Sequence, residues 1–243
     1  MPDDSLVLIH GAMHGAWCWR KVRGPLRDRG FDVHAITLTG LGDRAHLLRP
    51  ETGLDTHIED VAALIEMEEL SGVTIVGHSY GCMVGAGVVA RLPGRVRRMI
   101  YFDGPVPVDG ESSITVHPLG QGFVARRTVT DGIAVLPPTD GSTLGLADDD
   151  LAWVRRRLTP QPYGAVSTPL RLRPGWDDGV EQVYIRCLRG PDDPPRPYLS
   201  RVDPAAGWRY HEIRAGHDAM ISAPDELTEL ITAVCAGEAV SAR

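Results

Sequence analysis

The chain has 243 residues, of which 43% are hydrophobic and 23% are charged, a composition that excludes a disordered or fibrous protein. Its 32 acidic and 25 basic side chains give a net charge of −7, and the arginines are scattered among acids, so we expect no nucleic-acid partner. No apolar run approaches the ~20 residues of a membrane-spanning helix, and no secretory signal opens the sequence. We therefore expect no membrane partner and a cytoplasmic protein, with its four cysteines reduced.

Short apolar runs alternate with segments of helical spacing along most of the chain. We expect buried strands at residues 5–10, 31–38, 73–76, 98–102, 182–187 and 209–213. We expect helices at residues 17–29, after a capping box formed by residues 56–59, at 81–90 and at 224–236. This alternation predicts a single α/β domain over residues 1–243, with a mainly parallel sheet and helices on both faces.

One stretch interrupts the alternation. Residues 105–178 lie between two expected strands, far more than the ~10 to 15 residues of a crossover connection. They are rich in Pro, Gly and Asp, with one helix expected around residues 148–158. We interpret them as an inserted cap over the carboxyl ends of the strands, where open parallel sheets bind ligands.

The motif Gly77-His78-Ser79-Tyr80-Gly81 is the strongest chemical signal. It follows an expected strand and precedes an expected helix, the setting of a sharp turn that presents a serine hydroxyl above a sheet. An ordinary glycine-rich turn is the competing interpretation. In this setting we predict that Ser79 is a nucleophile.

A serine nucleophile needs a base, and His217 is the best of nine histidines. It lies between the last expected strand and the last helix, after the serine in chain order, as the hydrolase template requires. His10 and His78 are expected to hold loops, and the remaining histidines to be surface or hydrogen-bonded structural residues. No metal-ligand spacing such as H-E-x-x-H occurs, so we expect neither a metal nor a cofactor.

Two backbone amides should bind the oxyanion of the reaction. One belongs to Tyr80, which follows the nucleophile, and the other to the loop after the first strand, where Ala12 is the best candidate. A plain turn is the alternative for this loop.

Five segments carry a resemblance to a known family. They are HGAMHGAWCW from residue 10, TLTGLGDRAHL from 37, LDTHIEDV from 54, GHSYG from 77 and AGHDAM from 215. Together they resemble the α/β-hydrolase superfamily, and within it the small esterase and hydroxynitrile lyase branch. The resemblance spans nearly the whole chain except the cap, and it implies that Ser79 and His217 are nucleophile and base.

The third triad member departs from the family pattern. Relatives carry an aspartate in a Y-I-R-C-T-x-D-x-x-x-P pattern, and Gly190 stands at that position here. Asp192 or Asp193 could reach back from a shifted loop, or the acid could be Asp103, which follows the preceding strand. We favour Asp103 because the end of a strand fixes its position well, although a turn residue before Gly104 is a serious competing interpretation. A dyad of Ser79 and His217 without an acid is the remaining alternative.

These residues predict an esterase that acts on a small, largely apolar ester, lactone or thioester through an acyl-enzyme. A lyase of the hydroxynitrile or decarboxylase type is the alternative, and lyase-type relatives carry threonine at Gly11 and lysine at Asp218. A non-catalytic small-molecule receptor is the third hypothesis. The sequence permits a homodimer without determining the oligomeric state or the substrate.

Overall fold

The computed structural model describes residues 5–117, 120–189 and 196–238. Six strands form one sheet in the order β2-β1-β3-β4-β8-β9, and every pair of neighbours is parallel. The strands are β1 (Ser5–Ile9), β2 (Asp32–Ile36), β3 (Val73–His78), β4 (Val96–Phe102), β8 (Glu181–Cys187) and β9 (Arg209–Ile213). The predicted parallel α/β fold is therefore confirmed.

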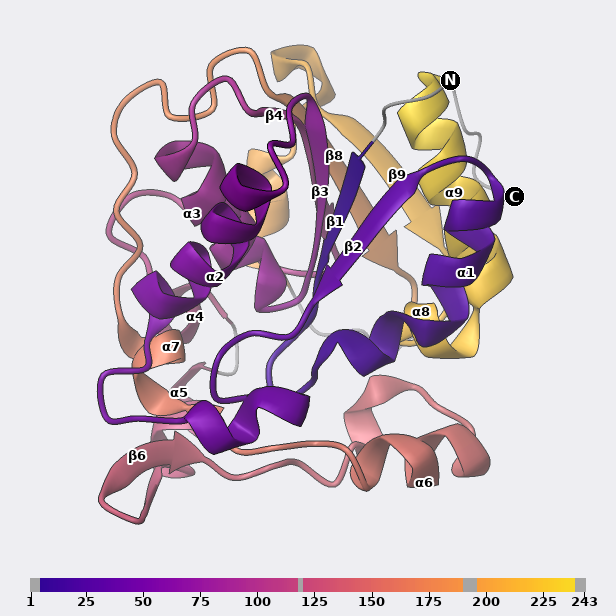
Figure 1. The fold of residues 1–243 in the computed structure, drawn as a ribbon. Coiled ribbons are helices and arrows are strands. Elements are labelled where there is room, and N and C mark those ends of the chain that lie inside the picture. Colours follow the sequence, from indigo (N-terminus) through magenta and orange to yellow (C-terminus); the bar gives the residue numbers. More distant parts are fainter. Residues whose placement is uncertain (1–4, 118–119, 190–195, 239–243) are drawn as a thin grey trace.

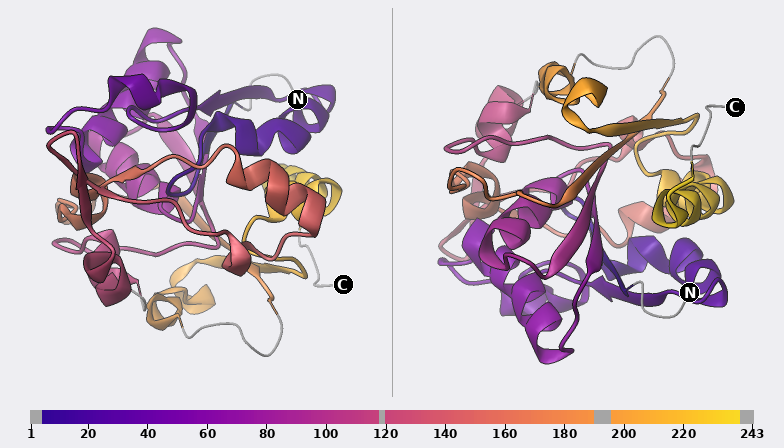
Figure 2. Two further views of the ribbon diagram at one scale, coloured as in Figure 1. Left: turned by 90° about the horizontal axis from the view of Figure 1, so that it is seen from below. Right: turned by 90° about the horizontal axis from the view of Figure 1, so that it is seen from above.

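Helices cover both faces of this sheet (Figure 1; Figure 2, right). One face carries α2 (Leu54–Met67) and α3 (Gly81–Arg91), and the other carries α1 (Arg20–Asp28), α8 (Ala219–Ser222) and α9 (Pro224–Ala236). Two hydrophobic clusters fill the two interfaces, one with Ile58 and Met83, the other with Trp19 and Leu227. Because the central strands are buried on both sides, they read as continuous apolar runs in the sequence.

The start of α2 corrects the predicted capping box. The helix begins at Leu54 with Gly53 as its N-cap, and Thr56 is the third helical residue, whose hydroxyl accepts a hydrogen bond from the Gly53 N–H at 3.2 Å. Thr56 therefore caps the helix from inside its first turn. The sequence pattern predicts Thr56 as the N-cap, so it places the start of the helix three residues too late. A threonine can occupy either end of a capping box, which explains the error.

Most of the segment between β4 and β8, which we call the insertion, lies beneath the carboxyl ends of the strands, and its last stretch runs back along one side of the molecule to the start of β8 (Figure 1; Figure 2, left). It contains one helix near the expected position, α6 (Asp148–Arg155). Beyond that helix it holds elements that the sequence did not predict: α4 (Ser113–Val116), α5 (Gly120–Ala125), α7 (Tyr163–Ser167) and a three-stranded sheet of β5 (Thr128–Thr130), β6 (Ile133–Leu136) and β7 (Gln161–Pro162). These pieces are too short to show a hydrophobic period.

No helix among the described residues is both long and apolar enough to cross a bilayer.

Candidate active site

Ser79 lies in a strained turn between β3 and α3. Its φ angle is 52°, in the left-handed region that non-glycine residues seldom adopt. The turn is tight, since a Cβ on Gly77 would lie 2.5 Å from the Gly81 carbonyl oxygen, and one on Gly81 would lie 2.6 Å from that of Ile9. Only glycine fits at both flanking positions. The backbone therefore holds Ser79 at the carboxyl end of the central strand, and its side chain is only partly buried.

His78 connects this turn to the loop that carries His217. Its Nε2–H donates to the carbonyl oxygen of His217 at 2.9 Å, and the two imidazole rings are 4.5 Å apart between centroids. Burial lowers the pKa of His78 to about 3, with nearby His217 adding to the effect, so this ring is neutral. His78 thus holds a loop, as the sequence indicated. Because it directly precedes Ser79, its contact with His217 brings the loop of His217 to the serine turn.

Asp103 lies against His217 at the end of β4. Its Oδ2 is 2.6 Å from Nδ1 of His217, and its Oδ1 accepts a hydrogen bond from the Cys187 N–H at 3.0 Å. Like Ser79, Asp103 has a positive φ angle, 49°, which turns the chain sharply out of the strand. Its carboxylate is fully buried. Asp192 and Asp193, the other candidates for the acid, lie outside the described residues.

Two arginines also contact the Asp103 carboxylate. Arg189 reaches Oδ2 and lies 2.6 Å from Nδ1 of His217, while Arg196 reaches Oδ1. Burial would raise the pKa of Asp103, but the hydrogen bond to His217 and the two guanidinium groups hold it well below its usual value. Asp103 is therefore ionised. The sequence did not single out either arginine, because each reads as one of many scattered basic residues.

The loop after β1 passes directly over the serine turn. A Cβ on Gly11 would lie 3.2 Å from Cβ of Ser79 and 2.9 Å from Nδ1 of His78. His10 anchors this loop: its Nδ1–H donates to the Gly11 carbonyl at 2.7 Å, and its Nε2 accepts from the Leu38 N–H at 3.1 Å. Burial lowers the pKa of His10 to about 3, consistent with this neutral state.

That anchor fixes the direction of the amide of Ala12. The Gly11 carbonyl and the Ala12 N–H belong to one trans peptide, so they point in opposite directions. The Tyr80 amide lies at the N-cap of α3, where helix amides lack intrahelical partners. The Tyr80 side chain is held away from this position, since its hydroxyl donates to Nδ1 of His57 at 2.8 Å. The Tyr80 amide therefore lies at the Ser79 turn, and the loop that holds Ala12 passes over that turn, while the oxyanion role of the two amides stays a prediction.

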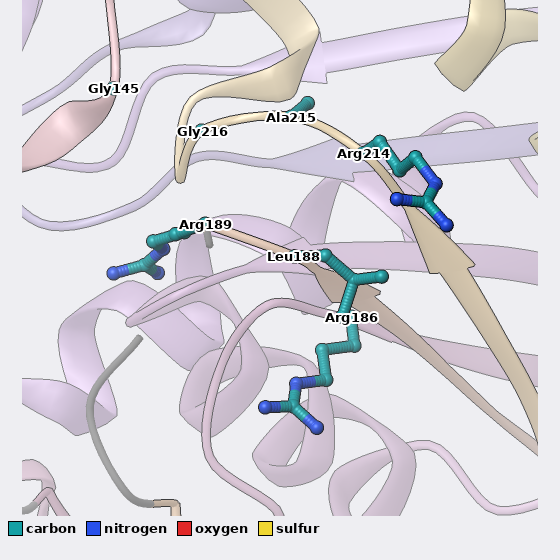
Figure 3. A pocket seen from close by; sticks show the side chains of 7 residues that line it. All are labelled: Gly145, Arg186, Leu188, Arg189, Arg214, Ala215 and Gly216. Atoms are coloured by element: carbon teal, nitrogen blue, oxygen red, sulfur yellow. The ribbon is translucent and has the colours of Figure 1, made fainter. Parts of the chain in front are cut away.

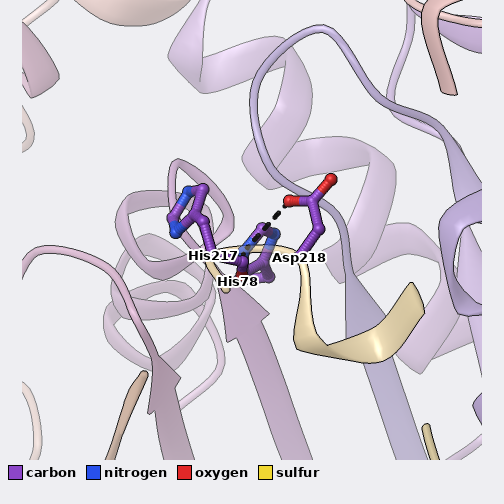
Figure 4. Close-up of side chains that lie close together, drawn as sticks. All are labelled: His78, His217 and Asp218. Carbon is purple, nitrogen blue, oxygen red and sulfur yellow. Dashed lines mark hydrogen bonds and ion pairs between the residues drawn. The ribbon is translucent and has the colours of Figure 1, made fainter. Parts of the chain in front are cut away.

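His78, His217 and Asp218 are the one group among the described residues that could offer three atoms to a metal ion (Figure 4). Nε2 of His78 carries a proton that it donates to a carbonyl, and Oδ2 of Asp218 is 2.9 Å from Nε2 of His14. Protein partners thus already engage one atom on each of these two side chains. The geometry is explained by hydrogen bonding between loops.

A cavity of about 670 Å³ lies beside the loop that carries His217 (Figure 3). It is lined by Gly145, Arg186, Leu188, Arg189, Arg214, Ala215 and Gly216. The guanidinium groups of its three arginines point in different directions, so they do not converge on one anion. Neither Ser79 nor His217 lines this cavity.

Comparison with known proteins relates the chain to hydrolases. The model of the alpha/beta hydrolase family matches residues 6–230. A carbendazim hydrolyzing esterase of Nocardioides sp. (strain SG-4G) is 35% identical over 240 residues, covering 95% of this chain and 99% of the relative. Methylesterase 10 of Arabidopsis thaliana is 27% identical over 255 residues, covering 95% and 91%.

Solved structures agree with the fold. An extracellular alpha/beta-hydrolase from a Paenibacillus species superimposes with a TM-score of 0.82 at 21% identity, covering 94% of this chain and 98% of the other. The pyrethroid hydrolase PytH superimposes with a TM-score of 0.74 at 20% identity, covering 97% and 98%.

Proposed function

Because the chain belongs to the alpha/beta hydrolase family, we propose that it hydrolyses carboxylic esters of small, largely apolar molecules, with Ser79 as nucleophile, His217 as base and Asp103 as acid. The observation that carries the proposal is the alignment of three loops at the carboxyl ends of the strands. Ser79 occupies the strained turn, His78 ties that turn to His217, and His217 contacts Asp103 at 2.6 Å.

The first half of the reaction forms an acyl-enzyme. The Asp103 carboxylate accepts the Nδ1–H of His217, which leaves the lone pair of Nε2 free to take the proton of the Ser79 hydroxyl. The serine oxygen attacks the ester carbonyl carbon, and the carbonyl electron pair moves to oxygen. The amides of Ala12 and Tyr80 donate to that oxyanion. When the tetrahedral intermediate collapses, the C–O bond to the alcohol breaks, and protonated His217 gives the alcohol its proton.

The second half repeats these steps with water. His217 takes a proton from water, the hydroxide oxygen attacks the acyl carbon, and collapse of the second intermediate breaks the bond to Ser79. His217 returns the proton to the serine oxygen. A carboxylic acid leaves and the enzyme is regenerated, so no metal or organic cofactor enters these steps.

Ser79→Ala tests the proposal with a fluorophosphonate probe and p-nitrophenyl acetate as substrate. We expect the wild type to be labelled once and to turn over the ester, and the variant to lose the label and on the order of 10⁴-fold or more in kcat. Ser71→Ala, an exposed serine before β3, is the matched control and should behave as the wild type. Full turnover by Ser79→Ala would refute the proposal. Carbendazim and simple methyl esters complete the panel, because the relatives are named for them.

The lyase alternative receives less support from this site. A threonine at position 11 would place its Cβ within 2.9 Å of the His78 ring, and Asp218 is fully buried rather than a cation in the site. Cleavage of mandelonitrile without ester turnover would nevertheless restore that alternative, and tight ligand binding without a burst of product would favour a receptor.

A further inference from the structure

A second charged pair, His14 with Asp218, lies in the site outside the proposed triad. His14 is 4% exposed and Asp218 is not exposed at all. Nε2 of His14 lies 2.9 Å from Oδ2 of Asp218. Ionised groups are costly to bury, so a pair that is this deeply buried calls for a role.

The partners of His14 fix its protonation state. Nδ1 lies 2.7 Å from the carbonyl oxygen of Ala12, and Nε2 lies 2.9 Å from the Asp218 carboxylate. Both partners can only accept, so both ring nitrogens must donate and His14 is an imidazolium. Burial opposes this charge, but the attraction of Asp218 outweighs it and raises the pKa of His14. Burial is likewise outweighed at Asp218, where His14 is the main group that lowers the pKa to about 2.

The two ends of the pair hold the two loops that the reaction needs. The Nδ1–H of His14 donates a hydrogen bond to the carbonyl of Ala12, the residue whose amide is the proposed oxyanion donor. Asp218 directly follows His217, and its own N–H donates to the Leu144 carbonyl of the insertion at 3.2 Å. The hydrogen bond between His14 and Asp218 therefore joins a loop near the start of the chain to one near its end, 204 residues apart.

Aromatic rings shield the pair from water. The His14 ring stacks on Trp17, with centroids 5.1 Å apart and planes at 23°. The edge of His78 faces His14 on another side, with centroids 6.4 Å apart. Such surroundings strengthen a charge-assisted hydrogen bond and make its geometry stiff.

We propose that His14 and Asp218 are positioning residues that set the placement of the Ala12 amide relative to the His217 imidazole. The proposal rests on the ester hydrolysis proposed above. Neither residue touches the substrate: His14 acts on the Ala12 carbonyl and through it on the backbone of Ala12, and Asp218 acts through the backbone of His217. Because a displacement of about 1 Å at a reacting group can cost on the order of 10²-fold in rate, breaking the pair should act on the chemical step.

Three variants test this, His14→Gln, Asp218→Asn and the double variant. For p-nitrophenyl acetate, with active sites counted by fluorophosphonate titration, we expect each single variant to lose about 10- to 100-fold in kcat per active site, with KM changed less than threefold. Two neutral amides can hydrogen-bond to each other. The double variant should therefore lose at least tenfold less than the product of the two single losses.

Glu181→Gln is the matched control. Glu181 pairs with the buried Arg98 at 2.7 Å and with Arg209 at 2.7 Å, at the opposite end of the strands from Ser79. This variant should unfold at lower urea concentration and keep its kcat per active site. If the His14 and Asp218 variants behave in the same way, the pair is merely structural and the positioning role is overturned.

The outcomes separate the two proposals. Turnover that survives in Ser79→Ala overturns ester hydrolysis by this site, and the positioning role with it. Turnover that depends on Ser79 but is unchanged per active site in His14→Gln and Asp218→Asn overturns the positioning role alone. If one single variant does not fold, the other single variant decides, and wild-type kcat per active site in it would overturn the proposal.

Discussion

Asp103→Asn is the sharpest test of the proposed triad, because four donors surround its two oxygens. Oδ1 accepts from the Cys187 N–H and Arg196, and Oδ2 accepts from His217 and Arg189. Asparagine offers only one oxygen, so either orientation turns an NH₂ group toward two donors. If that group faces His217, Nδ1 must accept and Nε2 carries the proton, which makes His217 useless as a base.

Two losses follow from this geometry. In serine proteases the equivalent exchange costs about 10⁴-fold in kcat, and we expect ~10³- to 10⁴-fold here in kcat per active site. The exchange also leaves two guanidinium groups without their buried anion, which should cost about 3–5 kcal/mol in the free energy of unfolding. Ester kinetics with titrated active sites measure the first loss, and urea unfolding followed by circular dichroism measures the second.

The matched control is the double variant Asp192→Asn/Asp193→Asn, which removes the competing loop carboxylates. We expect it to keep wild-type turnover. The reasoning is refuted if Asp103→Asn retains more than a tenth of the wild-type kcat per active site while the loop variant loses 10³-fold, because the acid would then come from the loop.

Three further outcomes follow from the packing and the charges. Gly104→Ala should unfold more easily and react more slowly with the fluorophosphonate, because its Cβ would lie 2.4 Å from the Ser79 carbonyl oxygen. The control is Gly24→Ala in α1, where a Cβ meets nothing within 4 Å; its free energy of unfolding should stay unchanged or rise by up to about 1 kcal/mol. The four buried thiols should not react with Ellman's reagent in the native protein and should all react in urea; reaction of even one in the native state would contradict the packing. In urea titrations, the free energy of unfolding of the wild type should exceed that of Asp218→Asn most between about pH 4 and 6.5. A difference that does not change with pH would show that the pair is uncharged. It should fall below pH 4 as Asp218 is protonated, since its folded pKa of about 2 lies under the unfolded value, and fall at high pH as the raised pKa of His14 is passed.

Much of the fold could be predicted from short stretches of the sequence. The apolar runs, the last helix α9 and the strand β4 are all close to their expected places, whereas α2 ends at Met67, five residues before Gly72, which the sequence suggested as its stop. Parallel strands with covered faces leave a continuous apolar signal, and helix ends leave capping residues. The elements of the insertion, α6 apart, are too short to show a hydrophobic period, so only the length of the insertion and the helix α6 could be predicted.

The site, too, contains residues that the sequence could indicate and residues that it could not. The sequence could indicate Ser79, because its turn is built from five consecutive residues whose glycines are needed for steric reasons. It could indicate His217 by its place between the last strand and the last helix and by its position after the serine in the chain. The homodimer and the cytoplasmic compartment stay predictions.

The partners of Asp103 and of the loop that holds Ala12 could not be predicted from the sequence. Arg189 and Arg196 reach Asp103 from 86 and 93 residues away, and His14 meets Asp218 across 204. The amino-acid order by itself determined the turn that holds Ser79 and the strands beneath it, since a tight glycine-flanked turn and the apolar run of a buried strand are each encoded in a few consecutive residues. Only the tertiary structure decided which carboxylate faces His217 and which charges balance it, because those contacts exist only after distant loops have met at one end of the sheet.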